Sequence, residues 1–448
     1  MGGNSEHCGC HQGLGVEIGR AGRFVRLADL LLPRWLVRLG LWLLLLLARP
    51  FVTTERVQRF WRRRFLCETP QGPVGTHGAF LRSFYDAVLS SGAFERLVAY
   101  LRGAPRWDSA CRIEGLLRPL ALATLRHRLL EDNGGPPPLT EIHLACCVEC
   151  DQSCQGCYSA CDRGGKTPDA ARLGQLFKEA SRSGAAVVHL LGKGEPFLDD
   201  ARGLKLVGAL RAHRQLFFTL ATSALHLTPA LCEAVAQTPN LLLLVSIDGF
   251  EALHDDRRGR GTWRQVVAAM TRLRERRAFF AYSCTVASTN WREVVSAEFV
   301  RSMLEAGCGL GVYSRYFSVQ SAADDPWAVP ASALPEYRER LDAARRLASM
   351  PLIDLDELES CTGCRARAGL SVYVDGTTGR VLPCIRLPWA PDACRLSQAP
   401  QGELDQVLRH PFFAELRQGR CSAGCWCGAD LPAEQQAVRE RAQAFDRT

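Results

Sequence analysis

The stretch Glu141–Tyr158 reads EIHLACCVECDQSCQGCY. Its apolar start predicts a buried strand over residues 141–146. The following loop carries Cys150, Cys154 and Cys157 in C-x3-C-x2-C spacing, and we call these three residues the cluster cysteines. Three thiolates in one loop can hold an iron–sulfur cluster, but a closed cubane uses four ligands. The incomplete set leaves one iron open to an outside molecule, and an open coordination position is typical of a catalytic metal site.

Zinc and a redox dithiol are the alternatives for this loop. Zinc normally takes four ligands, and no histidine is adjacent to the motif. Cys147 and Cys150 have the C-x2-C spacing of a redox pair, but they stand at a strand end with more cysteines following. Cys146 and Cys147 are expected to pack as small core hydrophobes. The pattern favours an iron–sulfur cluster.

Strand-like and helix-like segments alternate downstream. The expected strands cover residues 141–146, 186–191, 215–221, 241–247, 279–287 and 310–317. The expected helices cover residues 169–183, 199–212, 228–237, 262–276 and 290–306. Such alternation predicts an α/β fold with a parallel sheet and right-handed crossovers, in which ligands bind at the carboxyl ends of the strands.

Three motifs, in order and spacing, resemble those of the radical SAM superfamily. The cluster cysteines are the first. Val187–Pro196, VVHLLGKGEP, resembles the family's second strand and its Gly-Gly-Glu-Pro turn. Leu241–Gly249, LLLLVSIDG, with the loop His254–Thr262, resembles the family's fourth strand and the loop after it. The resemblance implies a partial (β/α)6 TIM-like barrel, preceded here by a helical region and followed by a small cysteine-rich α+β domain.

The resemblance also implies roles for individual residues. The cluster cysteines would hold a [4Fe-4S] cluster whose open iron binds S-adenosylmethionine. Reduction of that cluster, by a donor such as a flavodoxin or ferredoxin, would cleave the sulfonium to a 5′-deoxyadenosyl radical that abstracts a substrate hydrogen. The residues expected to contact S-adenosylmethionine are Gly192, Gly194 and Glu195 (ammonium), Ser246 and Asp248 (ribose), Arg257 (carboxylate) and Tyr158 (adenine).

Two positions depart from the family pattern. Lys193 stands where the first glycine of the turn is common, and its charge would compete with the ammonium. Gly156 stands before the third cysteine, where an aromatic residue is usual. For this reason Tyr158 is the expected support for adenine.

The C-terminal region holds seven of the 20 cysteines within residues 361–448. Such density is better explained by metal than by disulfides in a chain without a credible secretion signal. Alternating residues at 370–374 followed by Asp375–Gly376 predict a hairpin. The pattern Cys364-x14-Gly379-x4-Cys384 resembles the opening of SPASM and twitch domains. It implies one auxiliary [4Fe-4S] cluster, with structural zinc as the competitor; the expected ligands are Cys364, Cys384, Cys421 and either Cys425 or Cys427.

The positive charge is concentrated near the N-terminus. Residues 20–64 contain eleven arginines and two acidic residues, a net charge of +9 against +8 for the whole chain, so the remainder is balanced at −1. This distribution argues against nucleic-acid binding by the main domain. Leu39–Ala48 is the most apolar run. A helix from Pro33 to this run's end would be roughly 24 Å long, too short for a bilayer core of about 30 Å.

The segment after this run has a helical pattern with Val57, Phe60 and Trp61 on one face and arginines on the other. A Leu-rich stub followed by a basic amphipathic helix is typical of a peripheral membrane anchor. A helical hairpin packed on the catalytic domain and a signal peptide are the alternatives. The anchor predicts a cytoplasmic protein on the membrane face.

We therefore expect five regions. They are a membrane-associating segment (1–66), a helical region (67–138), a radical SAM core (139–350), a SPASM/twitch-like domain (351–430) and a helical tail (431–448). The leading hypothesis is a radical SAM enzyme acting on a lipid or prenyl compound. A peptide- or protein-modifying maturase and a non-catalytic iron–sulfur or zinc sensor are the alternatives.

Overall fold

The computed structural model describes residues 139–159, 164–318, 325–348, 350–357, 364–418 and 431–447. The predicted membrane-associating segment and the helical region before residue 139 lie outside this part of the chain. Among the described helices, none combines the length and the apolar character needed to cross a membrane.

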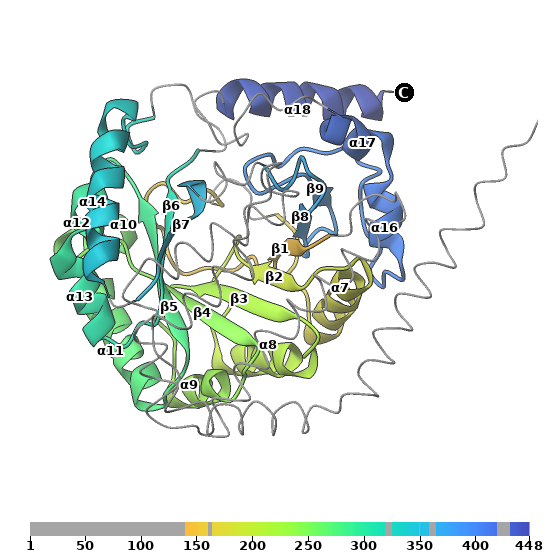
Figure 1. Ribbon diagram of the computed structural model, residues 1–448. Coiled ribbons are helices and arrows are strands. Elements are labelled where there is room, and N and C mark those ends of the chain that lie inside the picture. The colour runs from red at the N-terminus through yellow and green to blue at the C-terminus, as the bar shows by residue number, and fades with distance from the viewer. Residues whose placement is uncertain are drawn as a thin grey trace, which may run out of the picture.

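One sheet of nine strands organises the described residues. Its order is β7-β6-β5-β4-β3-β2-β1-β8-β9, and every neighbouring pair is parallel except β8 with β9. The strands are β1 (Glu141–Ala145), β2 (Val187–Leu190), β3 (Phe217–Thr222), β4 (Leu241–Ser246), β5 (Phe280–Val286), β6 (Gly311–Arg315), β7 (Leu352–Asp354), β8 (Ser371–Asp375) and β9 (Val381–Leu382). The first six confirm the predicted strands, and the curved parallel sheet is consistent with a partial TIM barrel (Figure 1).

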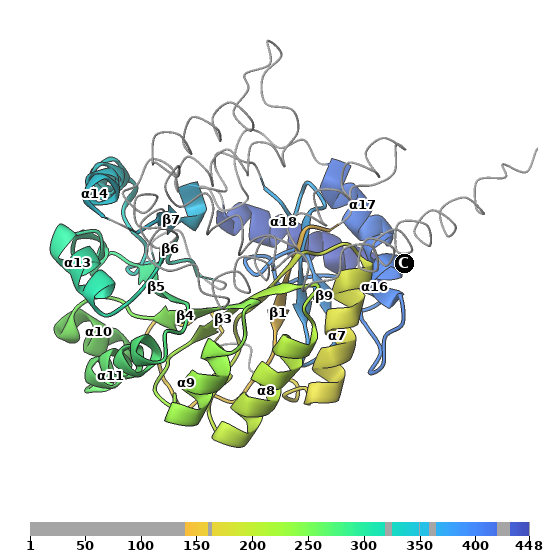
Figure 2. The same cartoon turned by 60° about the horizontal axis from the view of Figure 1, so that its bottom comes forward.

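The helices connect successive parallel strands and cover the outside of the sheet (Figures 1 and 2). They are α7 (Ala170–Arg182), α8 (Asp200–Ala212), α9 (Pro229–Ala236), α10 (Glu251–Arg258), α11 (Thr262–Glu275), α12 (Trp291–Val294), α13 (Ala297–Glu305) and α14 (Leu334–Leu347). Side-chain caps fix the first residues of α7 and α8. Asp169 accepts a hydrogen bond from the backbone N–H of Arg172, and Asp199 accepts one from the backbone N–H of Arg202, both at 2.8 Å.

Two parts of the helix prediction need correction. The single helix expected over residues 290–306 is two helices, α12 and α13. Val295 ends the first helix, and Ser296 caps the second by accepting from the Phe299 backbone N–H at 3.1 Å. Helix α10, which directly follows β4, was not predicted, because its eight residues are mostly charged and carry little apolar periodicity.

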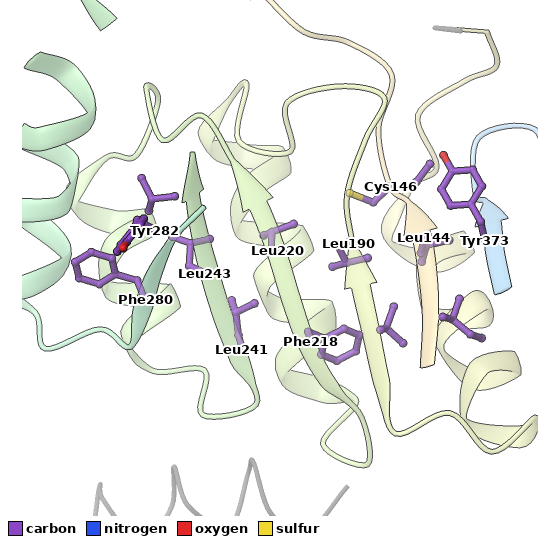
Figure 3. Packing of buried hydrophobic residues seen from close by; sticks show 14 of the residues in the cluster. Leu144, Cys146, Leu190, Phe218, Leu220, Leu241, Leu243, Phe280, Tyr282 and Tyr373 are labelled. Carbon is purple, nitrogen blue, oxygen red and sulfur yellow. The ribbon is translucent and has the colours of Figure 1, made fainter. Parts of the chain in front are cut away.

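The main core lies between the sheet and the helices. On β1, Ile142 and Leu144 point toward α7, where Leu176 and Ala180 line the same apolar contact. Figure 3 shows the equivalent positions of the neighbouring strands, among them Leu190, Phe218, Leu220 and Leu243. Cys146 and Cys147 are buried, which confirms their assignment as core residues, and Cys232, Cys284 and Cys308 are buried as well. A smaller cluster of Phe217, Leu242 and Ala281 packs on the opposite face of the sheet.

The C-terminal region continues the same sheet. The predicted hairpin is present as β8 and β9, but β8 also pairs in parallel with β1, from Glu141–Ser371 to Ala145–Asp375. All five residues of β8 are buried, so this strand needs neighbours on both faces and at both edges. The boundary predicted after residue 350 therefore does not separate two sheets. Helices α16 (Glu403–Leu408), α17 (Pro411–Gln418) and α18 (Leu431–Asp446) follow, with α16 against α7 and α18 against α17.

Candidate functional site

The cluster cysteines lie in the loop that leaves β1 at the carboxyl edge of the sheet, and all three are half-buried. The backbone N–H of Gln155 donates to the carbonyl of Arg257 at 2.9 Å, and its side-chain amide donates to the carbonyl of Asp256 at 3.0 Å. The loop is therefore anchored on α10, the helix that follows β4. Two of the three sequence motifs meet through these bonds.

The cluster cysteines offer three sulfur donors from one half-buried loop. Thiolate sulfur is the ligand type that iron–sulfur clusters use. The donor set, three thiolates on one partly exposed loop, fits a cubane with one open iron.

The turn after β2 packs directly against the cysteine loop. The backbone N–H of Glu195 donates to the carbonyl of Glu149 at 2.8 Å. A Cβ at Gly194 would lie 2.3 Å from that same carbonyl oxygen, so only glycine permits the approach. Gly192 has φ +64°, and a Cβ there would lie 2.4 Å from the Tyr158 hydroxyl. The structure thus places Gly192 against Tyr158 and Gly194 against the cysteine loop, and their contacts with S-adenosylmethionine stay predictions.

The side chain of Glu195 joins the turn after β2 to β3. Its side chain is buried, with Oε1 accepting from Thr222 Oγ1 at 2.5 Å and Oε2 from the Ser223 backbone N–H at 2.7 Å. The carboxylate ties the turn after β2 to the end of β3 and is not an exposed partner for an ammonium group.

Asp248 and Arg257 form an ion pair with each other. Asp248 is fully buried, and it accepts hydrogen bonds from Arg257, Arg258 and the backbone N–H of Thr285, the last at 2.7 Å. Burial alone would raise the pKa of Asp248, but the two guanidiniums hold it well below its usual range.

This ion pair fixes α10 and, through it, the cysteine loop. In this structure the side chains of Asp248 and Arg257 bind each other, and their expected contacts with ribose and carboxylate stay predictions. Ser246, half-buried at the end of β4, is the other candidate for the ribose contact. The sequence analysis did not predict that Arg258 and Thr285 bind Asp248. Two adjacent arginines after an aspartate in an apolar run were a signal for the arginine contact.

The positive charge of Lys193 is paired with an acidic side chain. It is buried, and its Nζ lies 2.7 Å from Asp375 Oδ2 at the end of β8. Burial would raise the pKa of Asp375, but hydrogen bonds from Lys193, Thr377 and Thr378 lower it. The lysine that stands in place of the family's glycine thus has its counter-charge in Asp375, 182 residues later in the chain.

An aromatic ring lies beside Gly156 even though this position itself has none. Gly156 has φ +65°, and a Cβ there would lie 2.7 Å from the ring of Tyr316, which follows β6. Tyr316 donates to Asp325 at 2.9 Å, and Tyr158 stacks on Phe317 with centroids 5.5 Å apart. Tyr158, Tyr316 and Phe317 therefore form an aromatic group beside the cysteine loop. Tyr316 and Phe317 were not predicted.

The expected auxiliary ligands are only partly described. Cys364 is buried, and Cys384, half-buried, accepts from the Arg386 backbone N–H at 3.3 Å. Cys421, Cys425 and Cys427 lie outside the described residues, so the auxiliary cluster stays a prediction.

Comparisons with known proteins agree with this geometry. Residues 146–299 match the radical SAM superfamily, a range that contains the cluster cysteines and the residues of both later motifs. The crystal structure of Streptococcus suis SuiB matches with a TM-score of 0.55 and 16% identity over 68% of this chain and 73% of that one. The structure of anSMEcpe with bound AdoMet matches with a TM-score of 0.50 and 16% identity over 62% of this chain and 82% of that one. A search of curated protein sequences finds no match.

Proposed function

We propose that this chain, which carries a radical SAM domain over residues 146–299, is an enzyme that cleaves S-adenosylmethionine and modifies a peptide or protein substrate. The observation that carries the proposal is the junction of three motifs at one sheet edge: the cysteine loop contacts both the turn after β2 and α10 after β4.

The cluster cysteines would hold a [4Fe-4S] cluster, with S-adenosylmethionine at its open iron. When bound, this pair supplies one-electron chemistry that yields a radical able to abstract a hydrogen atom. A low-potential donor such as a flavodoxin or ferredoxin would supply the electron. The auxiliary cluster, with Cys364 and Cys384 among its ligands, belongs to the same proposal.

The chain's own residues orient this chemistry. The turn at residues 192–195 presents carbonyl oxygens to a cation, while Glu195 holds the turn against β3. The buried Asp248–Arg257 pair holds α10 in place. Backbone carbonyls of α10 accept hydrogen bonds from Gln155, which lies between Cys154 and Cys157. The aromatic group of Tyr158, Tyr316 and Phe317 offers apolar ring faces on the same side and helps exclude water.

The fold comparisons favour a peptide over the lipid or prenyl substrate. SuiB has been crystallised bound to a precursor peptide, SuiA, with a TM-score of 0.54 to this chain. A structure of anSMEcpe with AdoMet and a peptide matches with a TM-score of 0.50 over 69% of this chain and 98% of that one. At 15–16% identity these likenesses concern the fold, so they support the substrate class only as an analogy. The basic Leu-rich N-terminus still favours membrane attachment, as a separate prediction.

The activity test uses protein reconstituted anaerobically with iron and sulfide, then reduced in the presence of S-adenosylmethionine. The expected product is 5′-deoxyadenosine, and Cys154→Ala should abolish it, because the cluster then loses one of three ligands. Cys161→Ala, a neighbouring cysteine outside the motif, is the matched control and should retain turnover. Bound iron without cleavage would favour the sensor alternative, and turnover by Cys154→Ala would refute the ligand assignment.

The substrate test adds short peptides encoded beside this gene, or else vesicles containing isoprenoid lipids. A peptide substrate should increase 5′-deoxyadenosine formation and show a change of mass. Stimulation by the vesicles alone would support the lipid alternative.

A further inference from the structure

A second group of side chains of the types that bind metals, histidine and glutamate, lies away from the cysteine loop. It consists of Glu141 and His143 on β1 and His189 on β2, and we call it the histidine cluster. His143 pairs with His189 across the two strands. Ile142 and Leu144 face α7, so Glu141 and His143 point to the opposite face of the sheet. Glu141 is the first residue of β1, whereas Cys150 follows the strand's other end.

The distances within the histidine cluster are too long for hydrogen bonds. Glu141 Oε2 lies 3.6 Å from His189 Nε2, and Glu141 Oε1 lies 3.9 Å from His143 Nε2. The imidazole rings stack with centroids 4.9 Å apart, and one ligand atom from each residue lies within 4.8 Å of the other two. Two bonds of about 2.1 Å to one tetrahedral ion hold the ligand atoms about 3.4 Å apart, which is slightly shorter than the two distances from Glu141 to the histidines. The spacing is therefore close to that of a mononuclear metal site.

Neighbouring groups orient two of these ligands. His189 Nδ1 is hydrogen-bonded to Thr219 Oγ1 at 2.9 Å, which turns its Nε2 toward Glu141. Arg365 Nε donates to Glu141 Oε1 at 2.6 Å and leaves Oε2 facing the histidine. Metal-binding histidines and carboxylates commonly have such outer hydrogen bonds, which fix the ring and the carboxylate in place.

Neither ring nitrogen of His143 is hydrogen-bonded to another described residue, so either one is available to an ion. Its Nδ1 is buried and has no hydrogen-bond partner within the described part of the chain, and its Nε2 has only the 3.9 Å approach to Glu141. An imidazole without partners in such a place costs free energy unless another group satisfies it. The side chains of His143 and His189 are 26% and 25% exposed, so an ion can reach them from solvent.

We propose that the histidine cluster binds one divalent transition-metal ion through Glu141, His143 and His189. Two imidazoles and one carboxylate are donors that suit Zn²⁺, and three protein ligands leave a position for water or a substrate group. This site is distinct from the cluster cysteines and does not depend on the proposed activity, because no thiolate takes part.

The test uses full-length, cluster-loaded protein incubated anaerobically with Zn²⁺ and then freed of unbound metal. Wild type should retain one zinc more than the His143→Gln/His189→Gln double variant. The zinc absorption edge should report nitrogen and oxygen ligands at about 2.0–2.1 Å for that ion. His226→Gln changes a more exposed histidine paired with Asp151 and should leave the zinc content unchanged.

A milder variant guards against misfolding. Thr219→Val keeps every ligand and removes only the bond to His189 Nδ1, so zinc affinity should fall by about 10–100-fold. Equal zinc content in the wild type and the double variant, a sulfur shell at about 2.3 Å for all bound zinc, or unchanged affinity in Thr219→Val would each overturn the site.

Discussion

Lys193 and Asp375 form a buried ion pair that joins the turn after β2 to the end of β8, with Nζ and Oδ2 2.7 Å apart. Their side chains are only 4% and 3% exposed, so each charge depends on the other. Strand β1, which carries the cysteine loop, lies between β2 and β8 in the sheet. The pair therefore spans the strand from which the cluster cysteines emerge, and it couples the C-terminal region to the proposed cofactor turn.

Replacing one partner should be much more harmful than replacing both. Asp375→Asn leaves the Lys193 ammonium buried without a counter-charge, and it should lower the free energy of unfolding by about 3–5 kcal/mol. The double variant Lys193→Met/Asp375→Leu should lie much closer to wild type. Urea unfolding measures both effects, with Glu415→Gln, from the exposed pair with Arg441, as the control that should change little. Equal loss in the single and double variants would contradict a specific pair.

A methyl group at Gly194 should displace the cysteine loop from the turn after β2. In Gly194→Ala the new Cβ would meet the Glu149 carbonyl at 2.3 Å, so the cysteine loop must move. Displacements of this size can cost on the order of 100-fold in rate, and we expect a comparable loss of 5′-deoxyadenosine formation.

Gly208→Ala is the matched control, because nothing lies within 4 Å of its Cβ position in α8. It should retain activity and gain up to about 1 kcal/mol of stability from helix propensity. Wild-type turnover by Gly194→Ala would mean that the loop and the turn are not in close contact.

Acid should destabilise the fold through His254, which is fully buried in α10. Its Nδ1 accepts from the Asp248 backbone N–H at 3.2 Å. Burial, together with the nearby Arg258, lowers the pKa of His254 to about 4 from the ordinary value of 6.5. Between these values the unfolded chain binds a proton that the folded chain does not, so stability falls as the pH drops from 6.5 toward 4. The full shift corresponds to roughly 3 kcal/mol.

His254→Asn keeps a hydrogen-bond acceptor but cannot titrate in this range. Unfolding of the metal-free protein at a series of pH values should therefore be less acid-dependent in this variant. His226→Asn, at a more exposed histidine, should keep the wild-type pH profile. Identical acid dependence in wild type and His254→Asn would refute the assignment.

Removing residues 1–66 tests the predicted membrane anchor. The full chain should float with vesicles that contain anionic lipid, and the truncated chain should not, because the segment carries the apolar run and the excess positive charge. Raising the salt concentration should weaken flotation of the full chain. Unchanged flotation after truncation would eliminate the anchor and favour a hairpin packed on the catalytic domain.

Sequence patterns predicted most of the fold because parallel strands are buried on both faces. Such strands are continuous apolar runs, and LLLLVS in β4 and FFTLAT in β3 are of this kind. Helix α10 escaped prediction because EALHDDRR has too few apolar residues to show a period. The pairing of β8 with β1 could not be predicted, because a hairpin pattern does not reveal which outer edge its first strand joins.

By itself, the sequence determined the alternating α/β architecture and the glycines and cysteines of the proposed site, because periodicity, turn chemistry and ligand spacing are local properties of a chain. Only the tertiary structure decided which charged residues are partners. Asp248 pairs with Arg257, Glu195 accepts from Thr222, and Lys193 has its counter-charge in Asp375. The physical reason is that a buried charge needs a partner in space, and folding can bring that partner from any distance along the chain.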